Sequence, residues 1–228
     1  MERYALITEK MPREFVLLQG RGCRWRRCTY CDYYGDVSAD PFEVNRPVLE
    51  RVTGRFGVLD VINSGSAMEL DERTLDLLQE VVRTRHIHTL WFEAHYMYRN
   101  HLADFARRFG PEVEVKFRCG VESFDGAQRE SWQKGIAAEV GPEEVARHFR
   151  GVCLLVGVEG QSREQILRDI ALADEHFDYY SVNLFCNNST AVRRDPALAA
   201  WLTEELFPLL KENKKAEVLA ENTDLGVG

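Results

Sequence analysis

The chain has 228 residues, of which 45% are hydrophobic and 29% are charged, a composition that excludes a disordered chain. Its 29 basic and 37 acidic residues leave a net charge of −8, which does not favour binding to a polynucleotide. No stretch approaches the roughly 20 apolar residues of a membrane-spanning helix, and the first residues lack the apolar core of a signal peptide. We therefore expect a cytoplasmic protein without a membrane partner.

Strands are predicted where short apolar runs end in polar or glycine residues, and helices where apolar residues recur at helical spacing. In chain order, the predicted elements are a strand at 15–18, a strand at 58–62, a helix at 72–85, a strand at 89–92, a helix at 102–109, strands at 113–117 and 152–158, a helix at 165–177, a strand at 181–185 and a helix at 198–210.

This alternation of strands and helices predicts the α/β class with parallel strands, arranged as a closed or partly closed barrel. We expect residues 1–228 to form a single domain, since no linker or internal repeat interrupts the pattern. Polar and glycine residues gather directly after the strands. Because barrel enzymes place their chemistry at the carboxyl ends of the strands, these loops are the candidate site.

The strongest signal is the segment Cys23-Arg-Trp-Arg-Arg-Cys28-Thr-Tyr-Cys31, in the loop after the first predicted strand. Six cysteines in an intracellular chain are expected to remain thiols rather than form disulfides. Three thiolates this close in sequence can converge on one metal centre.

Three interpretations of the cysteines remain open. They are unrelated buried thiols; or they bind zinc with a fourth cysteine; or they hold a four-iron, four-sulfur cluster, which is our main hypothesis. The candidates for a fourth zinc ligand are Cys119, Cys153 and Cys186. With three protein ligands, one iron of a [4Fe-4S] cluster is left open to bind another molecule.

The cysteine loop resembles that of the radical S-adenosylmethionine (SAM) superfamily, in which the spacing C-x3-C-x2-C is usual and an aromatic residue precedes the third cysteine. Tyr30 occupies that aromatic position, but four residues rather than three separate Cys23 from Cys28. The resemblance implies a partial (β/α)6 TIM-like barrel of the radical SAM type. It also implies a [4Fe-4S] cluster held by Cys23, Cys28 and Cys31, SAM as cofactor, and an electron donor such as flavodoxin or ferredoxin.

The same resemblance implies where SAM binds. The loop after the second strand usually contacts the SAM amine, the end of the fourth strand its ribose or carboxylate, and a glycine motif after the fifth strand its adenine. The residues expected to bind the cofactor are Tyr30, Ser64, Gly65, Ser66, Arg118, Glu122, Ser123, Gly160 and Gln161.

Four longer strings resemble the queuosine lyase family of the queuine-salvage route. They are residues 15–23, 61–66, 92–99 and 222–226. This resemblance implies cleavage of the glycosidic bond of queuosine or queuosine 5′-phosphate, with release of queuine. The implied partner is a small-molecule nucleoside or nucleotide.

Queuine presents a guanine-like edge whose N–H groups a carboxylate can accept, and Glu93 is our first candidate for that role and Asp224 our second. Hydroxyl and amine groups need further polar partners, and an arginine suits a phosphate or carboxylate. The expected substrate-binding residues are Glu93, His95, Tyr98, Arg99, Asn183, Asn187, Asn188 and Asp224. No residue is assigned as catalytic.

Two alternatives remain open at this point. One is a radical SAM enzyme that acts on another modified nucleoside or on tRNA. The other is a zinc-binding module without catalytic activity.

Overall fold

The computed structural model describes residues 1–228 and divides into two compact units. Unit 1 comprises Met1–Arg26, Tyr33–Phe117 and Leu225–Gly228, and unit 2 comprises Arg27–Asp32 and Arg118–Asp224. Strand β5 (Glu114–Glu122) begins in unit 1 and ends in unit 2. The expectation of a single domain over 1–228 stays a prediction.

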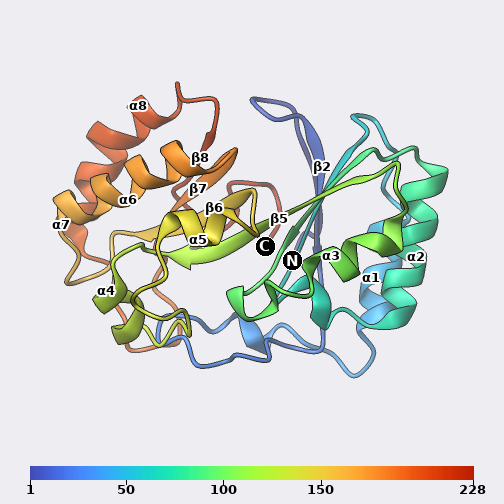
Figure 1. Cartoon of the computed structure of the whole chain (residues 1–228), viewed down its shortest axis with the longest axis horizontal. Coiled ribbons are helices and arrows are strands. Elements are labelled where there is room, and N and C mark those ends of the chain that lie inside the picture. Colours follow the sequence, from blue (N-terminus) through green and yellow to red (C-terminus); the bar gives the residue numbers. More distant parts are fainter. The chain divides into compact units, whose positions relative to one another are not determined.

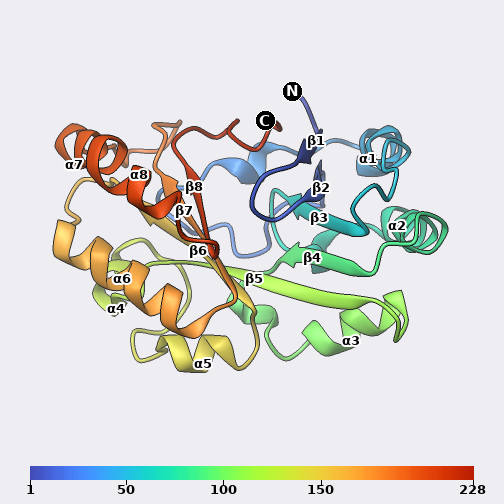
Figure 2. The same cartoon turned by 90° about the horizontal axis from the view of Figure 1, so that it is seen from above.

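Unit 1 is a sheet covered by helices on one side. Strand β1 pairs antiparallel with β2, whereas β2, β3 and β4 pair in parallel. Helices α1 and α2 lie side by side along these strands (Figures 1 and 2). The elements of unit 1 are β1 (Tyr4–Ile7), β2 (Arg13–Leu18), α1 (Pro41–Leu49), β3 (Val58–Asn63), α2 (Glu72–Thr84), β4 (Thr89–Glu93), α3 (Leu102–Ala106) and short 3-10 turns at Tyr33–Gly35, Ala67–Glu69, Tyr96–Tyr98 and Arg107–Phe109.

A buried ion pair joins β2 to β3 in unit 1. Arg13 Nε lies 2.8 Å from Asp60 Oδ2, and both side chains are fully buried. Removing either partner would strand a charge in the core, so the pair specifies the register of these two strands. That register aligns the loops that follow β2 and β3.

Unit 2 is a second βα series. Its strands β5, β6, β7 and β8 pair in parallel, and α6 packs against β6 and β7. All six residues of β6 are buried, as expected for a parallel strand covered on both faces. The remaining elements of unit 2 are α4 (Gly126–Ser131), α5 (Pro142–Ala146), β6 (Gly151–Val156), α6 (Arg163–His176), β7 (Tyr179–Leu184), α7 (Pro196–Trp201), a π-helical turn (Leu202–Leu206), α8 (Phe207–Leu210) and β8 (Ala216–Leu219).

All six predicted strands and the predicted α2 and α6 are confirmed; their ends shift little except at β5, which continues to Glu122 instead of ending at residue 117. The helix predicted over 102–109 is α3 followed by a 3-10 turn. The helix predicted over 198–210 is confirmed as a continuous helical segment, but a π-helical turn that was not predicted joins α7 to α8. Pro208 cannot donate to the carbonyl of residue 204, and this breaks the regular pattern there. The sequence analysis missed β1, α1, α4, α5 and β8. None of the helices is both apolar enough and long enough to cross a bilayer.

Candidate functional site

The loop after β2 carries three cysteines in the pattern that the sequence analysis singled out. None of the six cysteines forms a disulfide bond, and Cys23, Cys28 and Cys31 are each partly exposed. In unit 1 the backbone N–H of Arg26 donates to Cys23 Sγ over 3.4 Å. Such N–H donors stabilise thiolates, so the environment of Cys23 suits a metal-bound sulfur.

In unit 2, Cys28 and Cys31 pack against an apolar cluster at the ends of β6 and β7. The buried members of this cluster are Tyr30, Trp132, Leu155, Val158 and Phe185. An apolar wall beside partly exposed thiols is the setting in which a protein tunes an iron–sulfur cluster.

The donor set of the loop therefore fits a [4Fe-4S] cluster, since it has three thiols outside any disulfide, an N–H donor to one of them and an apolar wall beside the other two. No group of three or more His, Cys, Asp or Glu side chains is already gathered as a metal site. Cys23 belongs to unit 1 and the other two cysteines to unit 2. The assignment of the ligands therefore depends on their spacing in the sequence and their chemistry.

A buried carboxylate lies beside Cys23 in unit 1, and the sequence analysis missed it. Glu69, only 8% exposed, accepts hydrogen bonds from Arg24 N (2.9 Å), Ser66 N (2.7 Å) and Tyr98 Oη (3.0 Å). Ser66 and Glu69 form a capping box around the 3-10 turn after β3. The pattern Ser66-Ala-Met-Glu69 is the signal from which this residue was predictable.

The loop Ser64–Gly65–Ser66, expected at the SAM amine, is tightly fitted to its surroundings. Ser64 Oγ donates to the carbonyl of Asp36 over 3.0 Å, and Ser66 Oγ accepts from His95 N over 3.0 Å. A Cβ on Gly65 would lie 2.1 Å from Glu69 Oε2 and 3.2 Å from the Cα of Cys23. A side chain at this position would therefore displace the carboxylate of Glu69 from its hydrogen bonds.

The loop after β4 brings the predicted substrate residue His95 against the cysteine loop. The ring of His95 stacks on Trp25, with centroids 5.4 Å apart and an interplanar angle of 18°. His95 Nδ1 accepts from the backbone N–H of Met97 over 3.1 Å, which fixes the orientation of the imidazole. Glu93 lies before this loop, at the end of β4. Arg99 lies at the other end of the loop, and its guanidinium is 4.6 Å from the centre of the Tyr96 ring.

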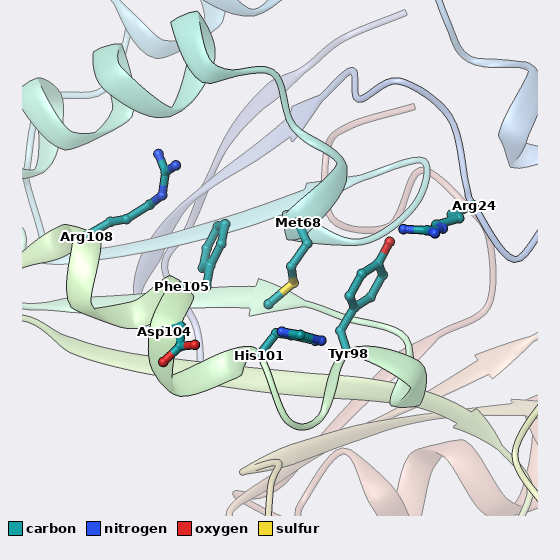
Figure 3. Close-up of a pocket in the computed structure, with 7 residues that line it drawn as sticks. All are labelled: Arg24, Met68, Tyr98, His101, Asp104, Phe105 and Arg108. Atoms are coloured by element: carbon teal, nitrogen blue, oxygen red, sulfur yellow. The ribbon is translucent and has the colours of Figure 1, made fainter.

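A cavity of about 410 Å³ in unit 1 opens beside the same loop. In Figure 3 the hydroxyl of Tyr98 points toward Arg24 at one end of the cavity, and Arg108 lies at the other end. Burial, and then the charge of Glu69, raise the pKa of Tyr98 to about 12, so the phenol stays protonated. The lining residues are Arg24, Met68, Tyr98, His101, Asp104, Phe105 and Arg108.

Tyr30 is hydrogen-bonded to a buried ion pair, Lys134 and Glu122, in unit 2. Lys134 Nζ donates to Tyr30 Oη (3.0 Å) and to Glu122 Oε1 (2.9 Å). Burial opposes the charged form of Lys134, but the attraction of Glu122 outweighs it and holds the ammonium pKa well above its usual value. Burial likewise raises the pKa of Tyr30 well above its usual value. Lys134 is therefore a buried cation beside the cysteine loop, and the sequence analysis missed it.

Glu122, expected to contact SAM, occupies a special backbone position. Its φ is +65°, and a bulge interrupts the pairing of β5 with β6 between Gly120 and Glu122. A left-handed non-glycine residue costs free energy and persists where the surrounding structure holds it, often at functional sites. This position aims the carboxylate at Lys134.

Several other predicted residues in unit 2 have side chains that are bound within the fold. Ser123 donates to Asp169 Oδ2 over 2.6 Å, and Gln161 bridges the backbones of Leu155 and Val158. Arg118 is buried with its guanidinium over the ring of Tyr179, while Gly160 has a φ of +90° in open space.

The predicted substrate residues of unit 2 are mostly bound to backbone groups. Asn187 Oδ1 accepts from Arg194 N over 2.8 Å, and Asn188 Nδ2 donates to the carbonyl of Tyr30 over 2.7 Å. Asp224 Oδ2 accepts from the N–H groups of Ala220 and Glu221. Asn183 differs, because its Oδ1 is buried and has no hydrogen-bond partner. Such an atom is available to accept a hydrogen bond from a ligand or an ordered water.

Comparison with solved structures places this geometry among known proteins. The chain is 38% identical to the queuine lyase from Clostridium spiroforme bound to SAM and queuine, with a TM-score of 0.94 over 100% of this chain and 99% of that one. Streptococcus suis SuiB is 15% identical with a TM-score of 0.56, and the chain covers half of it, so that likeness concerns the fold alone. No protein-family model and no curated protein matches the chain.

Proposed function

The chain belongs to the queuine lyase family of radical SAM enzymes, and we propose on that premise that it cleaves the glycosidic bond of queuosine or queuosine 5′-phosphate to release queuine. Its identity of 38% to a queuine lyase over its whole length carries the proposal. The same likeness confirms the expected fold class, a partial (β/α)6 TIM-like barrel of the radical SAM type.

The enzyme uses a [4Fe-4S] cluster and SAM, and we assign Cys23, Cys28 and Cys31 as the cluster ligands. When bound, these cofactors supply a 5′-deoxyadenosyl radical that removes a hydrogen atom from the substrate. The chain's own residues bind and orient the reactants and keep water away from them. Radical chemistry suits this bond, because a 7-deazapurine has carbon where ordinary purine nucleosides are protonated at N7.

For the SAM site we retain Tyr30, Gly65, Glu122 and Gly160, which lie at the cysteine loop or at the ends of strands. Ser64 and Ser66 shape the loop around Gly65. Ser123, Gln161 and Arg118 are buried within unit 2 and support the strand ends.

For the substrate we propose that Glu93 accepts from the guanine-like edge of the base. His95, Tyr98 and Arg99 follow it on the loop after β4, and the unpaired Oδ1 of Asn183 offers an acceptor in unit 2. Asn187, Asn188 and Asp224 are already engaged by backbone groups, and we therefore assign them to loop structure instead.

We further propose a small acidic electron carrier, flavodoxin or ferredoxin, as the reductant, and the cytoplasm as the location. Six cysteines without a disulfide bond accord with a reducing compartment. The exposed Arg24 in the cysteine loop offers a positive charge to such a carrier in a chain of net charge −8.

The test is an anaerobic assay of the reconstituted protein with SAM, a chemical reductant and either queuosine or queuosine 5′-phosphate. We expect queuine and 5′-deoxyadenosine in chromatography with mass detection, and neither product without SAM. Formation of 5′-deoxyadenosine with another modified nucleoside or with tRNA, but no queuine from either queuosine substrate, would favour the alternative substrate class. A protein that retains zinc and forms no 5′-deoxyadenosine would refute the enzyme assignment.

A further inference from the structure

Glu69 connects three loops of unit 1 through one buried carboxylate. Its donors come from the cysteine loop after β2 (Arg24 N), from the loop after β3 (Ser66 N) and from the loop after β4 (Tyr98 Oη). Oε1 receives the first and third of these donors, and Oε2 receives the second. Both oxygens of this buried group are therefore occupied by N–H or O–H donors, as burial of a carboxylate requires.

The same residue anchors the chain on both sides of Cys23. The carbonyl of Glu69 accepts from the N–H of Arg21 over 2.9 Å, two residues before the cysteine. Its carboxylate accepts from the N–H of Arg24, one residue after the cysteine. A short segment fixed at both ends has little freedom, so the position of Cys23 depends on the position of Glu69.

The packing around Gly65 reinforces this dependence. The Cβ position of Gly65 lies against both Glu69 Oε2 and the Cα of Cys23, so the backbones of Gly65 and Cys23 and the carboxylate of Glu69 are in close contact. The capping box formed by Ser66 and Glu69 holds the 3-10 turn on which the carboxylate sits. The frame around Cys23 is therefore built from the residues that follow β3.

We propose that Glu69 is a positioning residue that holds Cys23 in place as a cluster ligand. This inference rests on the proposed function, since it gives Cys23 the role of a ligand. It also gives the loop after β3 a second role, because this loop supports the cluster through Glu69 in addition to any contact with SAM. A glutamine cannot replace the carboxylate, because its amide would turn an N–H donor toward at least one of the donors that Glu69 accepts.

The test compares Glu69→Gln with Asp169→Asn in reconstituted protein. Asp169 is a matched control in unit 2, since it is buried and also accepts from one hydroxyl and one backbone N–H. The measurements are the rate of iron release to a chelator, the electron paramagnetic resonance (EPR) spectrum of the reduced cluster, and the thermal midpoint of the cluster-free chain. Tyr98→Phe is a third variant, which removes one donor but leaves Arg24 N bound.

We expect Glu69→Gln to release iron roughly tenfold faster than the unaltered protein and to change the EPR line shape, because it strands buried donors beside Cys23. Asp169→Asn should lower the thermal midpoint but keep the iron-release rate and the spectrum, and Tyr98→Phe should fall between the two. The proposal is overturned if Glu69→Gln keeps normal iron release, or if Asp169→Asn releases iron equally fast. If the unaltered protein holds no cluster, the proposed function itself fails, and that result is distinct from either outcome.

Discussion

Some residues near the cysteine loop could be predicted from a local sequence pattern, whereas the roles of others are evident only from contacts in the folded chain. The three cysteines and Tyr30 lie within nine positions, so their common chemistry is visible in a short string. Lys134 is 104 positions from Tyr30, to which it donates, and no local pattern indicates that contact. The side chains of Asn187, Asn188 and Asp224 resemble substrate ligands in sequence, but backbone groups already bind them.

At this scale, we predict that Lys134→Met destabilises the cluster-free chain by about 3–5 kcal/mol, because it leaves the partly enclosed carboxylate of Glu122 unpaired. The double variant Lys134→Met with Glu122→Gln should recover more than half of that loss, since it removes both charges together. Urea denaturation of the three proteins measures both values. Equal stability of the single and double variants would show that the ion pair is not the cause.

Elements of secondary structure were predicted well where burial is strong and poorly where it is weak. Strand β6 is a continuous apolar run and is plain in the sequence. Strands β1 and β8 have only four residues each, which is too short a stretch to show a clear alternation. Helix α1 contains Pro47 in its interior, which is atypical of a helix.

The loop after β7 is an element whose role emerges only from its contacts. Besides the bond from Asn188 to the carbonyl of Tyr30, Ser189 donates through both N–H and Oγ to Asp32 Oδ2, at 3.0 and 2.8 Å. Both partners belong to the part of the cysteine loop that lies in unit 2. This loop therefore holds the segment that contains Cys28 and Cys31.

We predict that the double variant Asn188→Ala with Ser189→Ala loses iron several-fold faster than the unaltered protein, because two side-chain hydrogen bonds to the cysteine loop, of about 1 kcal/mol each, are removed. The Michaelis constant for queuosine should change little, since these side chains support the loop. Iron release and steady-state kinetics measure the two effects. A large rise in the Michaelis constant with normal iron retention would return Asn188 to the substrate site.

At the scale of the whole molecule, the fold could be predicted from two features, the alternation of strands and helices and the cysteine loop. The pattern of apolar runs predicted the α/β class, and the loop directed attention to the radical SAM type of barrel, which the comparison confirms. The sequence could not indicate which polar loop residues face a ligand, because that depends on partners in distant segments. Asn183 shows the difference, since its unpaired oxygen is visible only in the folded chain.

The most direct test of this account is EPR spectroscopy of the anaerobically reconstituted and reduced protein, before and after addition of SAM. We predict about four iron atoms per chain and a cluster signal that SAM alters, because one iron is open to it. Cys28→Ala should abolish the signal, whereas Cys153→Ala, which changes a buried thiol on β6, should retain it. A signal that is indifferent to SAM, or that survives in Cys28→Ala, would contradict a three-cysteine cluster as the basis of the activity.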